Sequence, residues 1–261
     1  MFAEERQEVI FQIVNRRGSV RVAELSEELD ISEVTIRRDL EELQRQNRVV
    51  RTHGGAMSTY SAGNGKSFSQ HAVREVEQKR RIAKAAYSMV LDDNTLLLDN
   101  SSTAIELLRL IAAGGKKNIR IITTSLLAPT ILKDVEGCTL QIVGGEVNFT
   151  SQSVEGSSAC SFLRGVRVDK CFVGINGIDE EFGFSTPRYM DADIKNCIIH
   201  SAHCSIILAD STKIGKSFLA HVDAPDYLIT DRKVPGFSYD ALTETTVIFA
   251  NKTNQSEAET V

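Results

Sequence analysis

The sequence predicts two folded domains, an N-terminal winged helix-turn-helix of the α+β class and a larger α/β domain with a mostly parallel, doubly wound sheet. Three short helical patterns and a basic strand occupy the first 57 residues, and a polar stretch rich in Gly and Ser follows them. Beyond it, apolar strand-like runs alternate with helical segments, which is typical of a parallel sheet covered on both faces.

The chain is long enough for two domains. It has 261 residues, of which 42% are hydrophobic, so its larger part can bury a sizeable core. We expect the helix-turn-helix domain, a linker, the α/β domain and a flexible polar tail to occupy 1–57, 58–74, 75–250 and 251–261.

The first domain is expected to begin with two short helices. Two groups of apolar residues follow a helical period, Val9, Ile10, Ile13 and Val14 and then Val22, Leu25 and Leu29. Gly18 is expected to end the first helix, and the second ends at Asp30-Ile31. A tight turn then leads into a third helix.

The third helix is expected to begin after Ser32, whose side chain can accept a hydrogen bond from the backbone N–H near Thr35. Its residues divide into two opposite stripes, Ile36, Leu40, Leu43 and Asn47 against Val34, Arg38, Glu41 and Arg45. One face can therefore pack on a core while the other meets a partner. A solvated amphipathic helix without a partner has the same spacing.

The start of this helix has the chemistry of a DNA-reading surface. In helix-turn-helix proteins, only the first turns of the recognition helix reach deep into the major groove. Arginine is suited to that place, because its rigid fork can bond guanine or clamp a phosphate. We expect DNA contacts from Ser32, Val34, Thr35, Arg37 and Arg38.

A wing is expected behind the helix, with Arg48–Arg51 as a strand and Gly54-Gly55 as its turn. Arg51, His53 and Gly54 are expected to lie along the DNA backbone or minor groove. Positive charge is local, since residues 1–57 hold nine Arg and no Lys against eleven Asp or Glu, a net charge of −2. Affinity should therefore depend on a few placed guanidinium groups and on two or more copies acting together.

These residues resemble the N-terminal domain of the DeoR family of bacterial repressors. The resemblance rests on Ser32–Leu40, Glu42-Leu43 and Arg51–Ala56, which together form a highly specific signature. It implies a sequence-specific regulator that binds double-stranded operator DNA, as a homodimer or homotetramer.

A helix containing Ile82–Val90 is expected to open the second domain. Seven β-rich runs follow, at Thr95–Asp99, Ile119–Thr124, Thr139–Val143, Asp169–Ile175, Ser205–Asp210, Tyr227–Thr230 and Thr246–Ala250. The intervening helices are expected at about Thr103–Ala113, Leu126–Val135, Ser157–Leu163 and Asp191–Ala202.

Ligands of a doubly wound sheet bind outside the carboxyl ends of its strands, so the strand exits matter most. Four exits carry suitable groups, Asp99-Asn100-Ser101-Ser102-Thr103, Thr124-Ser125, Gly144-Gly145 and Asp210 with Lys213. Hydroxyls and free N–H groups at a helix start favour an anion, so a phosphate on a polyol would fit. Each motif alone is more typical of helix capping or a turn, but four such exits on one sheet favour a ligand site.

The second domain resembles the sensor domain of the DeoR family, which is similar in fold to ribose-5-phosphate isomerase and glucosamine-6-phosphate deaminase. The matching residues are Lys79–Ala83, Leu98-Asp99, Thr103, Gly144-Gly145, Phe172–Gly174, Gly177-Ile178, Lys195 and Asp210–Lys213. The resemblance implies a phosphorylated sugar or sugar alcohol as effector, with Lys79 among the residues that bind it. It also implies a repressor of a carbohydrate-utilisation operon that needs no cofactor.

The alternative is a sugar-phosphate isomerase-like enzyme with an appended DNA-binding domain. Gly177–Glu181 places an acidic loop after an apolar strand, and an isomerase needs a carboxylate base near its substrate carbonyl. A solvated turn closed by Gly183 explains the same residues. We expect a regulator and not an enzyme, because catalysis would not explain the first domain. A purely architectural DNA-binding protein would not need polar groups at four strand exits.

Composition argues against several other classes. Met1–Arg6 is acidic and lacks an apolar run, and no stretch reaches about 18 apolar residues, so neither a signal peptide nor a membrane span is expected. The five cysteines include no C-x-x-C pair, which argues against a disulfide framework and a metal site. We therefore expect a cytoplasmic protein with no metal and no membrane partner.

Overall fold

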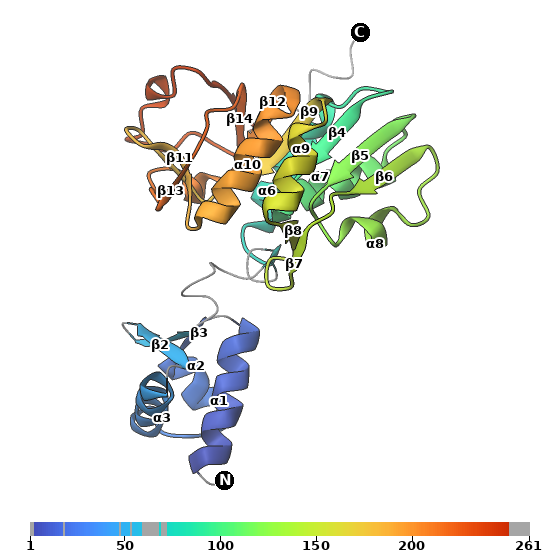
Figure 1. Ribbon diagram of the computed structural model, residues 1–261. Helices are drawn as coiled ribbons and strands as arrows, with labels where there is room; N and C mark the ends of the chain where they lie inside the picture. The colour runs from blue at the N-terminus through green and yellow to red at the C-terminus, as the bar shows by residue number, and fades with distance from the viewer. Residues whose placement is uncertain are drawn as a thin grey trace. The chain divides into compact units, whose positions relative to one another are not determined.

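The computed structural model describes residues 3–17, 19–46, 48–52, 54–58, 68 and 72–250, and all structural statements concern these residues. The chain divides into two compact units, Met1–His71 and Ala72–Val261, which are described separately (Figure 1). Gly18, Asn47 and His53 lie outside the described residues, as do most of the expected linker and the whole of the expected tail.

The first unit contains three helices and an antiparallel sheet of order β1-β3-β2. Its elements are α1 (Ala3–Arg17), β1 (Ser19–Arg21), α2 (Val22–Leu29), α3 (Glu33–Arg45), β2 (Val49–Thr52) and β3 (Gly55–Ser58). The predicted three helices and hairpin are confirmed, and we call the β2–β3 hairpin the wing. Strand β1 was not predicted, because three residues are too few to show a period.

The predicted apolar stripe of α3 lies at the centre of this unit's core. Ile36, Leu40 and Leu43 are fully buried and pack in one cluster with Ile10 and Leu25 of the preceding helices. The polar stripe faces solvent. Burial of apolar surface therefore sets the rotation of α3 about its axis and leaves its other face free for a partner.

A buried ion pair joins the first helix to the third. Asp39 is 3% exposed. Its carboxylate accepts hydrogen bonds from Arg6 Nε at 2.5 Å, from Arg6 Nη2 at 3.1 Å and from Gln7 Nε2 at 3.1 Å. A buried carboxylate is tolerated when its charge and lone pairs are satisfied in this way. The pair therefore fixes α3 against α1.

The second unit is built on a sheet of order β15-β14-β12-β9-β4-β5-β6, in which all neighbouring strands are parallel. The strands are β4 (Thr95–Leu98), β5 (Ile119–Thr123), β6 (Cys138–Ile142), β9 (Val168–Gly174), β12 (Ala202–Leu208), β14 (Tyr227–Thr230) and β15 (Thr246–Phe249). The predicted doubly wound sheet is confirmed. The chain passes from β4 to one side for β5 and β6 and to the other side for the rest, so the strand order reverses beside β4.

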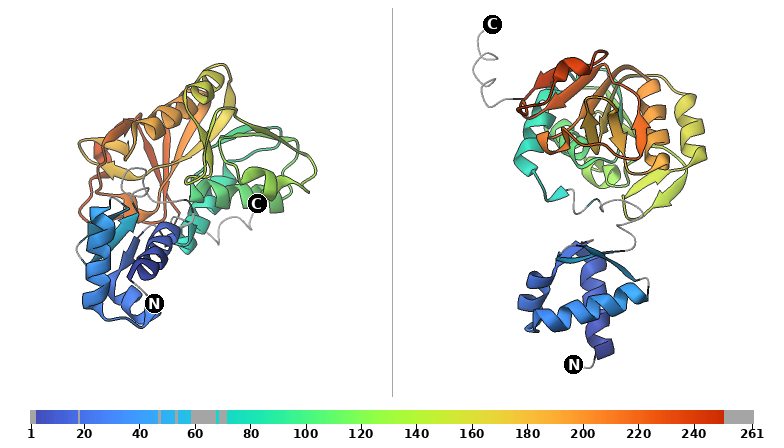
Figure 2. Two further views of the ribbon diagram at one scale, coloured as in Figure 1. Left: turned by 60° about the horizontal axis from the view of Figure 1, so that its bottom comes forward. Right: turned by 90° about the vertical axis from the view of Figure 1, so that its left-hand side faces the viewer.

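Helices cover both faces of this sheet (Figure 1 and Figure 2). One face carries α6 (Val76–Ser88), α7 (Ser102–Ala113) and α8 (Ala128–Leu132), and the other carries α9 (Ser157–Arg164) and α10 (Tyr189–His200). Helix α8 is shorter than the expected segment 126–135. Strand residues such as Leu97, Phe172 and Ile207 are fully buried, because the sheet is covered on both sides.

Two small antiparallel sheets were not predicted. Strands β7 (Glu146–Asn148) and β8 (Ser153–Glu155) form a hairpin, and β10 (Gly177–Asp179), β11 (Gly183–Thr186) and β13 (Ala220–Val222) form a sheet. Two short 3₁₀ helices, η1 (Ser211–Lys213) and η2 (Tyr239–Ala241), were also missed. These segments are short and lack the continuous apolar runs that mark the equally short strands β4, β14 and β15 of the main sheet.

None of the described helices is long and apolar enough to cross a bilayer. No three His, Cys, Asp or Glu side chains there are placed to hold a metal ion. The five cysteines are free thiols, and burial raises the pKa of Cys171 to about 12.

We predict that Asp39→Ala destabilises the first unit by about 3 kcal/mol, because it leaves the mostly buried Arg6 guanidinium without its anion. Chemical denaturation followed by circular dichroism measures this change in the free energy of unfolding. The control is Glu42→Ala, which removes a carboxylate from the exposed pair with Arg45 on the same helix and should have little effect. Equal losses for the two variants would contradict the role of Asp39.

Candidate functional site

The start of α3 is capped as predicted. The Ser32 side chain accepts a hydrogen bond from the backbone N–H of Thr35 at 3.3 Å, and the hydroxyl oxygens of the two residues lie 2.9 Å apart. Val34 is 64% exposed, and Arg37 and Arg38 are also exposed. The residues predicted to contact bases therefore share one exposed end of a rigid helix.

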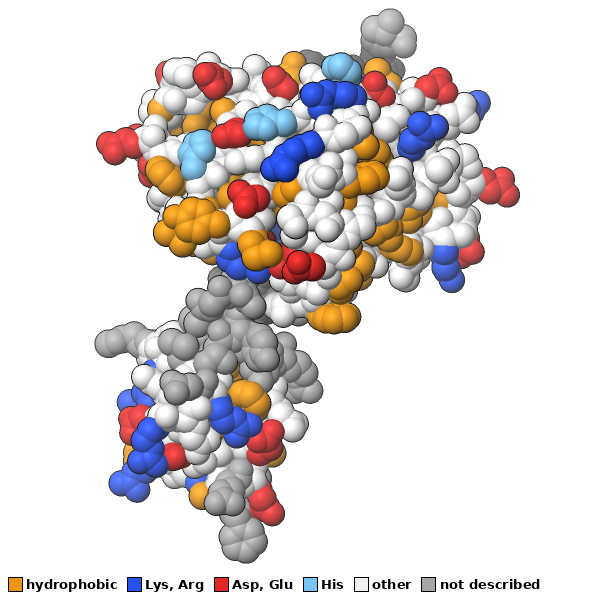
Figure 3. Space-filling view, viewed as in Figure 1, with side chains coloured by type: hydrophobic (Ala, Val, Ile, Leu, Met, Phe, Trp, Pro, Cys, Tyr) orange, Lys and Arg blue, Asp and Glu red, His pale blue; other side chains and the backbone are white. Residues whose placement is uncertain are grey.

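Arginine side chains gather over α3 and the neighbouring strand (Figure 3). Four of the five arginines between residues 37 and 51 are paired with carboxylates of the same unit, as Arg37–Glu33, Arg45–Glu42, Arg48–Glu8 and Arg51–Glu41. Arg38 forms no ion pair with any residue that the structure describes. Within this group and these described contacts, Arg38 alone can meet DNA without breaking an internal pair.

Two glycines shape the tip of the wing. Gly54 has a φ of +94°, a left-handed conformation that residues with side chains rarely adopt. At Gly55, a Cβ atom would lie 2.0 Å from the carbonyl oxygen of Val20, so any side chain would push β3 away from β1. Both glycines therefore have structural roles. A contact between Gly54 and DNA stays a prediction, and His53 lies outside the described residues.

In the second unit, Asp99 lies at the point where the strand order reverses, directly after β4, and is 1% exposed. Its Oδ2 atom accepts hydrogen bonds from the Gly174 N–H at the end of β9 and from Lys195 Nζ on α10, each at 2.9 Å. Its Oδ1 atom accepts from the Ser101 N–H at 2.9 Å. One buried carboxylate thereby joins the exit of β4 to β9 and to α10.

A small cavity of about 20 Å³ lies beside Asp99. Nine residues line it, Asp99, Asn100, Thr124, Ser153, Val154, Glu155, Asp191, Ile194 and Lys195. The hydroxyl of Thr124 is buried and has no hydrogen-bond partner among the described residues. Burying such a hydroxyl costs free energy unless a ligand or a water molecule forms a hydrogen bond with it. The structure thus brings three predicted effector residues, Asp99, Asn100 and Thr124, to one polar site.

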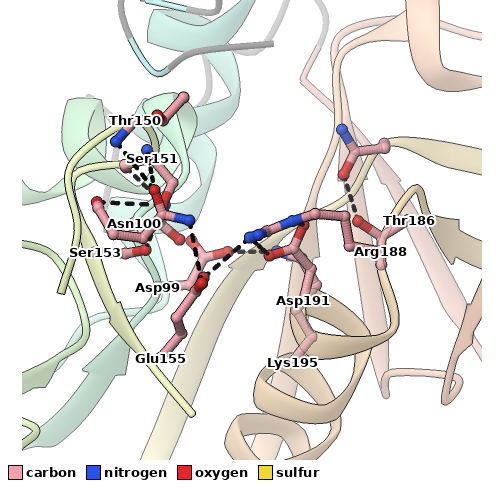
Figure 4. A network of polar contacts seen from close by, with 12 residues as sticks. Asp99, Asn100, Thr150, Ser151, Ser153, Glu155, Thr186, Arg188, Asp191 and Lys195 are labelled. Atoms are coloured by element: carbon pink, nitrogen blue, oxygen red, sulfur yellow. Dashed lines mark hydrogen bonds and ion pairs between the residues drawn. The ribbon is translucent and has the colours of Figure 1, made fainter. Parts of the chain in front are cut away.

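Sequence analysis missed the other side of this site. Arg188 donates to Glu155 at 2.9 Å and also pairs with Asp191 (Figure 4). Asn100 Nδ2 donates to the Ser151 carbonyl at 3.0 Å, so the β7–β8 hairpin forms one wall. Lys195 is among the residues that carry the family resemblance, but no role follows for it from the sequence. Its spacing of four from Asp191 places both on one face of α10, but nothing in the sequence connects that face with the exit of β4.

A second group of predicted residues lies at the exit of β12. Asp210 accepts a hydrogen bond from the Thr212 N–H at 3.0 Å and caps η1, which contains Lys213. Lys79, on α6, is 4% exposed. Burial lowers the pKa of both lysines, and the nearby charge of Asp210 opposes that shift in each. Two lysines around one carboxylate give a partly buried, cationic site that is suited to an anion.

Several residues that were predicted to bind the effector cap a helix or close a turn, which sequence analysis gave as the alternative for each motif. The Ser101 side chain accepts from the Ala104 N–H at 3.2 Å and caps α7, whose first turn contains Ser102 and Thr103. The Ser125 hydroxyl accepts from the backbone N–H two residues later at 3.2 Å. For the Ser101 and Ser125 side chains, the structure confirms capping and turn roles.

The two glycines after β6 differ from each other. At Gly145, a Cβ atom would lie 2.7 Å from the Glu155 carbonyl oxygen, so a side chain would separate the two ends of the β7–β8 hairpin. Gly144 has open space around its Cα atom. At Gly145, the close neighbour is therefore the chain itself, and ligand binding by the two glycines stays a prediction.

The acidic loop considered for an isomerase is a closed turn. The Asp179 carboxylate accepts hydrogen bonds from the backbone N–H groups of Phe182 at 2.9 Å and Glu181 at 3.0 Å. These two bonds lower the pKa of Asp179. Gly183 completes the turn with a φ of +70°. A carboxylate that is held by its own loop and has a lowered pKa is poorly suited to act as a general base.

Two family models match the chain. The DeoR-like helix-turn-helix domain matches residues 6–62, and the DeoR C-terminal sensor domain matches residues 74–232.

Similar proteins extend over nearly the whole chain. The HTH-type transcriptional regulator GolR of Listeria innocua is 31% identical over 90% of this chain and 92% of its own length. The HTH-type transcriptional repressor GlcR of Bacillus subtilis is 30% identical over 89% and 90%. The glycerol-3-phosphate regulon repressor of Escherichia coli K12 is 28% identical over 92% and 95%. Ribose 5-phosphate isomerase A of Methanocaldococcus jannaschii is similar in structure, with a TM-score of 0.40 and 19% identity, over 53% of this chain and 54% of that chain.

We predict that Thr124→Val raises the free energy of unfolding of the second unit by about 1 kcal/mol, because valine has nearly the same shape without the unsatisfied hydroxyl. Thr123→Val is the matched control. The Thr123 hydroxyl donates to the Leu98 carbonyl at 2.7 Å and accepts from the Ser125 N–H at 3.0 Å, so its loss should destabilise the unit. Denaturation curves measure both changes. A destabilised Thr124→Val variant would show that the hydroxyl is satisfied in solution.

Proposed function

Because this chain belongs to the DeoR family of helix-turn-helix transcriptional regulators, we propose that it is a sequence-specific repressor of a carbohydrate-utilisation operon. A phosphorylated sugar or sugar alcohol bound to the second unit releases it from operator DNA or modulates its binding. One observation carries the proposal, the combination in one chain of a capped, arginine-bearing α3 with unsatisfied polar chemistry at the strand exits of a sheet.

The DNA half of the proposal places the first turns of α3 in the major groove. Thr35, Arg37 and Arg38 then meet base edges, and Arg38 does so without losing an ion pair to any residue that the structure describes. Arg37 has to leave Glu33, which lies 2.7 Å away in an exposed pair. Exposed pairs contribute little, so this exchange is not a large barrier.

The repressor is proposed to act as a homodimer or homotetramer in the cytoplasm. Residues 1–57 carry a net charge of −2, and most guanidinium groups near α3 are paired. One such domain therefore holds duplex DNA weakly. Two linked copies on half-sites about one DNA turn apart, or a multiple of it, add their free energies of binding.

The effector half of the proposal uses both polar groups of the second unit. Lys79 and Lys213 supply the positive charge for a phosphate. Asp99 and Thr124 supply an acceptor and an unsatisfied hydroxyl for the hydroxyls of a polyol. The name of the glycerol-3-phosphate regulon repressor, a similar protein, supports this ligand class.

The cavity beside Asp99 has room for about one water molecule. A sugar therefore needs an opened form, in which a wall of the cavity such as the β7–β8 hairpin has moved outward. We propose that this opened form binds the effector better and that its paired DNA-binding domains no longer match the half-site spacing. The shift in DNA affinity cannot exceed the difference in effector affinity between the two forms.

An enzyme is the less favoured function. The carboxylate that sequence analysis considered as a base, Asp179, is bonded to its own turn, and the similar proteins cited above are named as regulators. Assays with phosphorylated sugars test this directly. Robust isomerase turnover that Asp179→Ala abolishes would replace the repressor proposal.

Arg38→Ala should lower the affinity for operator DNA by about tenfold to a hundredfold, because a bidentate contact to one base is lost. Affinity for unrelated duplex should change far less. Fluorescence anisotropy at fixed salt measures both, with a duplex carrying the promoter of the encoding gene as the specific probe. Arg45→Ala, at the other end of α3, is the control and should retain discrimination. Full discrimination by Arg38→Ala would place the DNA-reading face elsewhere.

Lys213→Ala should leave operator binding unchanged and abolish the response to effector. A thermal-shift screen of phosphorylated pentoses, hexoses and hexitols identifies a ligand, since a compound that binds only the folded protein raises the melting temperature. That compound should not stabilise Lys213→Ala. Lys216→Ala removes an exposed lysine three residues away and should respond normally. An undiminished shift in Lys213→Ala would exclude Lys213 from the site.

A further inference from the structure

We propose that Arg51 is a positioning residue, which holds the wing against α3 and does not itself contact the DNA backbone. Sequence analysis placed Arg51 on the backbone, since a guanidinium on a wing can meet phosphates. The contacts of the side chain favour the other role. The inference deepens the proposed operator binding and rests on it.

The Arg51 guanidinium packs against α3, the proposed recognition helix. Its Nη1 atom donates to the backbone carbonyl of Arg37 at 3.0 Å and to Glu41 Oε1 at 3.2 Å. The side chain is 24% exposed, and its Nε atom is buried without a partner among the described residues. Arg38, one residue after the carbonyl that Arg51 bonds, is exposed and forms no ion pair with a described residue. The two guanidinium groups therefore differ in availability.

These contacts join the wing to the turn of α3 that reads DNA. Arg51 lies opposite Ala56 in the β2–β3 hairpin, and β3 is in turn paired with β1. Arg51 is the described residue whose side chain bonds this hairpin to α3. The distance between the wing tip and Arg38 consequently depends on it. A site that is held in its binding geometry before DNA arrives loses less conformational entropy on binding.

The two roles make opposite predictions for salt dependence and for Glu41. Loss of a phosphate contact makes the negative slope of log affinity against log salt shallower by about 0.9. Loss of a positioning residue lowers affinity without changing that slope. If Arg51 bound phosphate, Glu41 would compete for it, and removal of Glu41 would strengthen binding. If Arg51 positions the wing, removal of Glu41 weakens binding.

The experiment uses the full chain and a duplex carrying the promoter of the encoding gene, over a range of salt concentrations. Arg51→Ala should weaken binding about tenfold, as loss of a charge-assisted hydrogen bond does, with an unchanged slope. Glu41→Ala should bind more weakly than Glu42→Ala, a control that removes the same charge one residue along α3. The double variant Arg51→Ala/Glu41→Ala should bind no more weakly than Arg51→Ala alone. Two results would overturn the proposal. One is a salt slope that is shallower by about 0.9 in Arg51→Ala, and the other is binding by Glu41→Ala as tight as by Glu42→Ala.

A second measurement needs no DNA. Hydrogen exchange of the free chain should be faster at the β2–β3 amides in Arg51→Ala and in Glu41→Ala than in the wild type, and unchanged in Glu42→Ala. Unchanged exchange in Arg51→Ala overturns the positioning role. Absence of promoter binding by the wild type would instead refute the proposed function, and the exchange result would still decide whether Arg51 holds the wing.

Discussion

The second unit depends on one buried carboxylate. Asp99 follows the strand at which the sheet reverses its order, and it bonds the end of the adjacent strand and a lysine of the helix beyond. A charge at 1% exposure persists only with such partners. The same hydrogen bonds that join these elements also place the negative charge of Asp99 beside the small cavity. Stability and the proposed effector binding therefore rest on the same atoms.

The seven strands of the parallel sheet and most helices could be predicted, because the strands are continuous apolar runs that are buried on both faces and the longer helices show a helical period. The helix cap at Ser32 was also predictable, because capping is a contact between residues three apart. Strand β1, the β7–β8 hairpin and the sheet of β10, β11 and β13 were not. Strands β1 and β13 pair with segments far along the chain, and the β7–β8 and β10–β11 hairpins have strands of three or four residues without a continuous apolar run.

The candidate sites were predictable only in part, because some of their residues come together from distant parts of the chain. The carboxyl ends of parallel strands meet at one edge of the sheet, so Asp99, Asn100 and Thr124 could be placed at one site from the predicted strand ends alone. Glu155, Arg188 and Asp191 meet them from a hairpin and a helix far along the chain, and no spacing rule reports that meeting. On the first unit, sequence located the arginines but not their carboxylate partners, which decide how each arginine can be used.

The internal pairing of these arginines affects how the protein competes with non-specific DNA for its time on the genome. Where a guanidinium has a carboxylate beside it, the two charges largely cancel for an approaching phosphate, so the attraction to DNA of any sequence is weak. Random sequence, which outnumbers operators by about a millionfold or more, then retains each molecule only briefly. A regulator present in few copies can in this way spend its time searching, instead of being titrated away by the bulk of the genome.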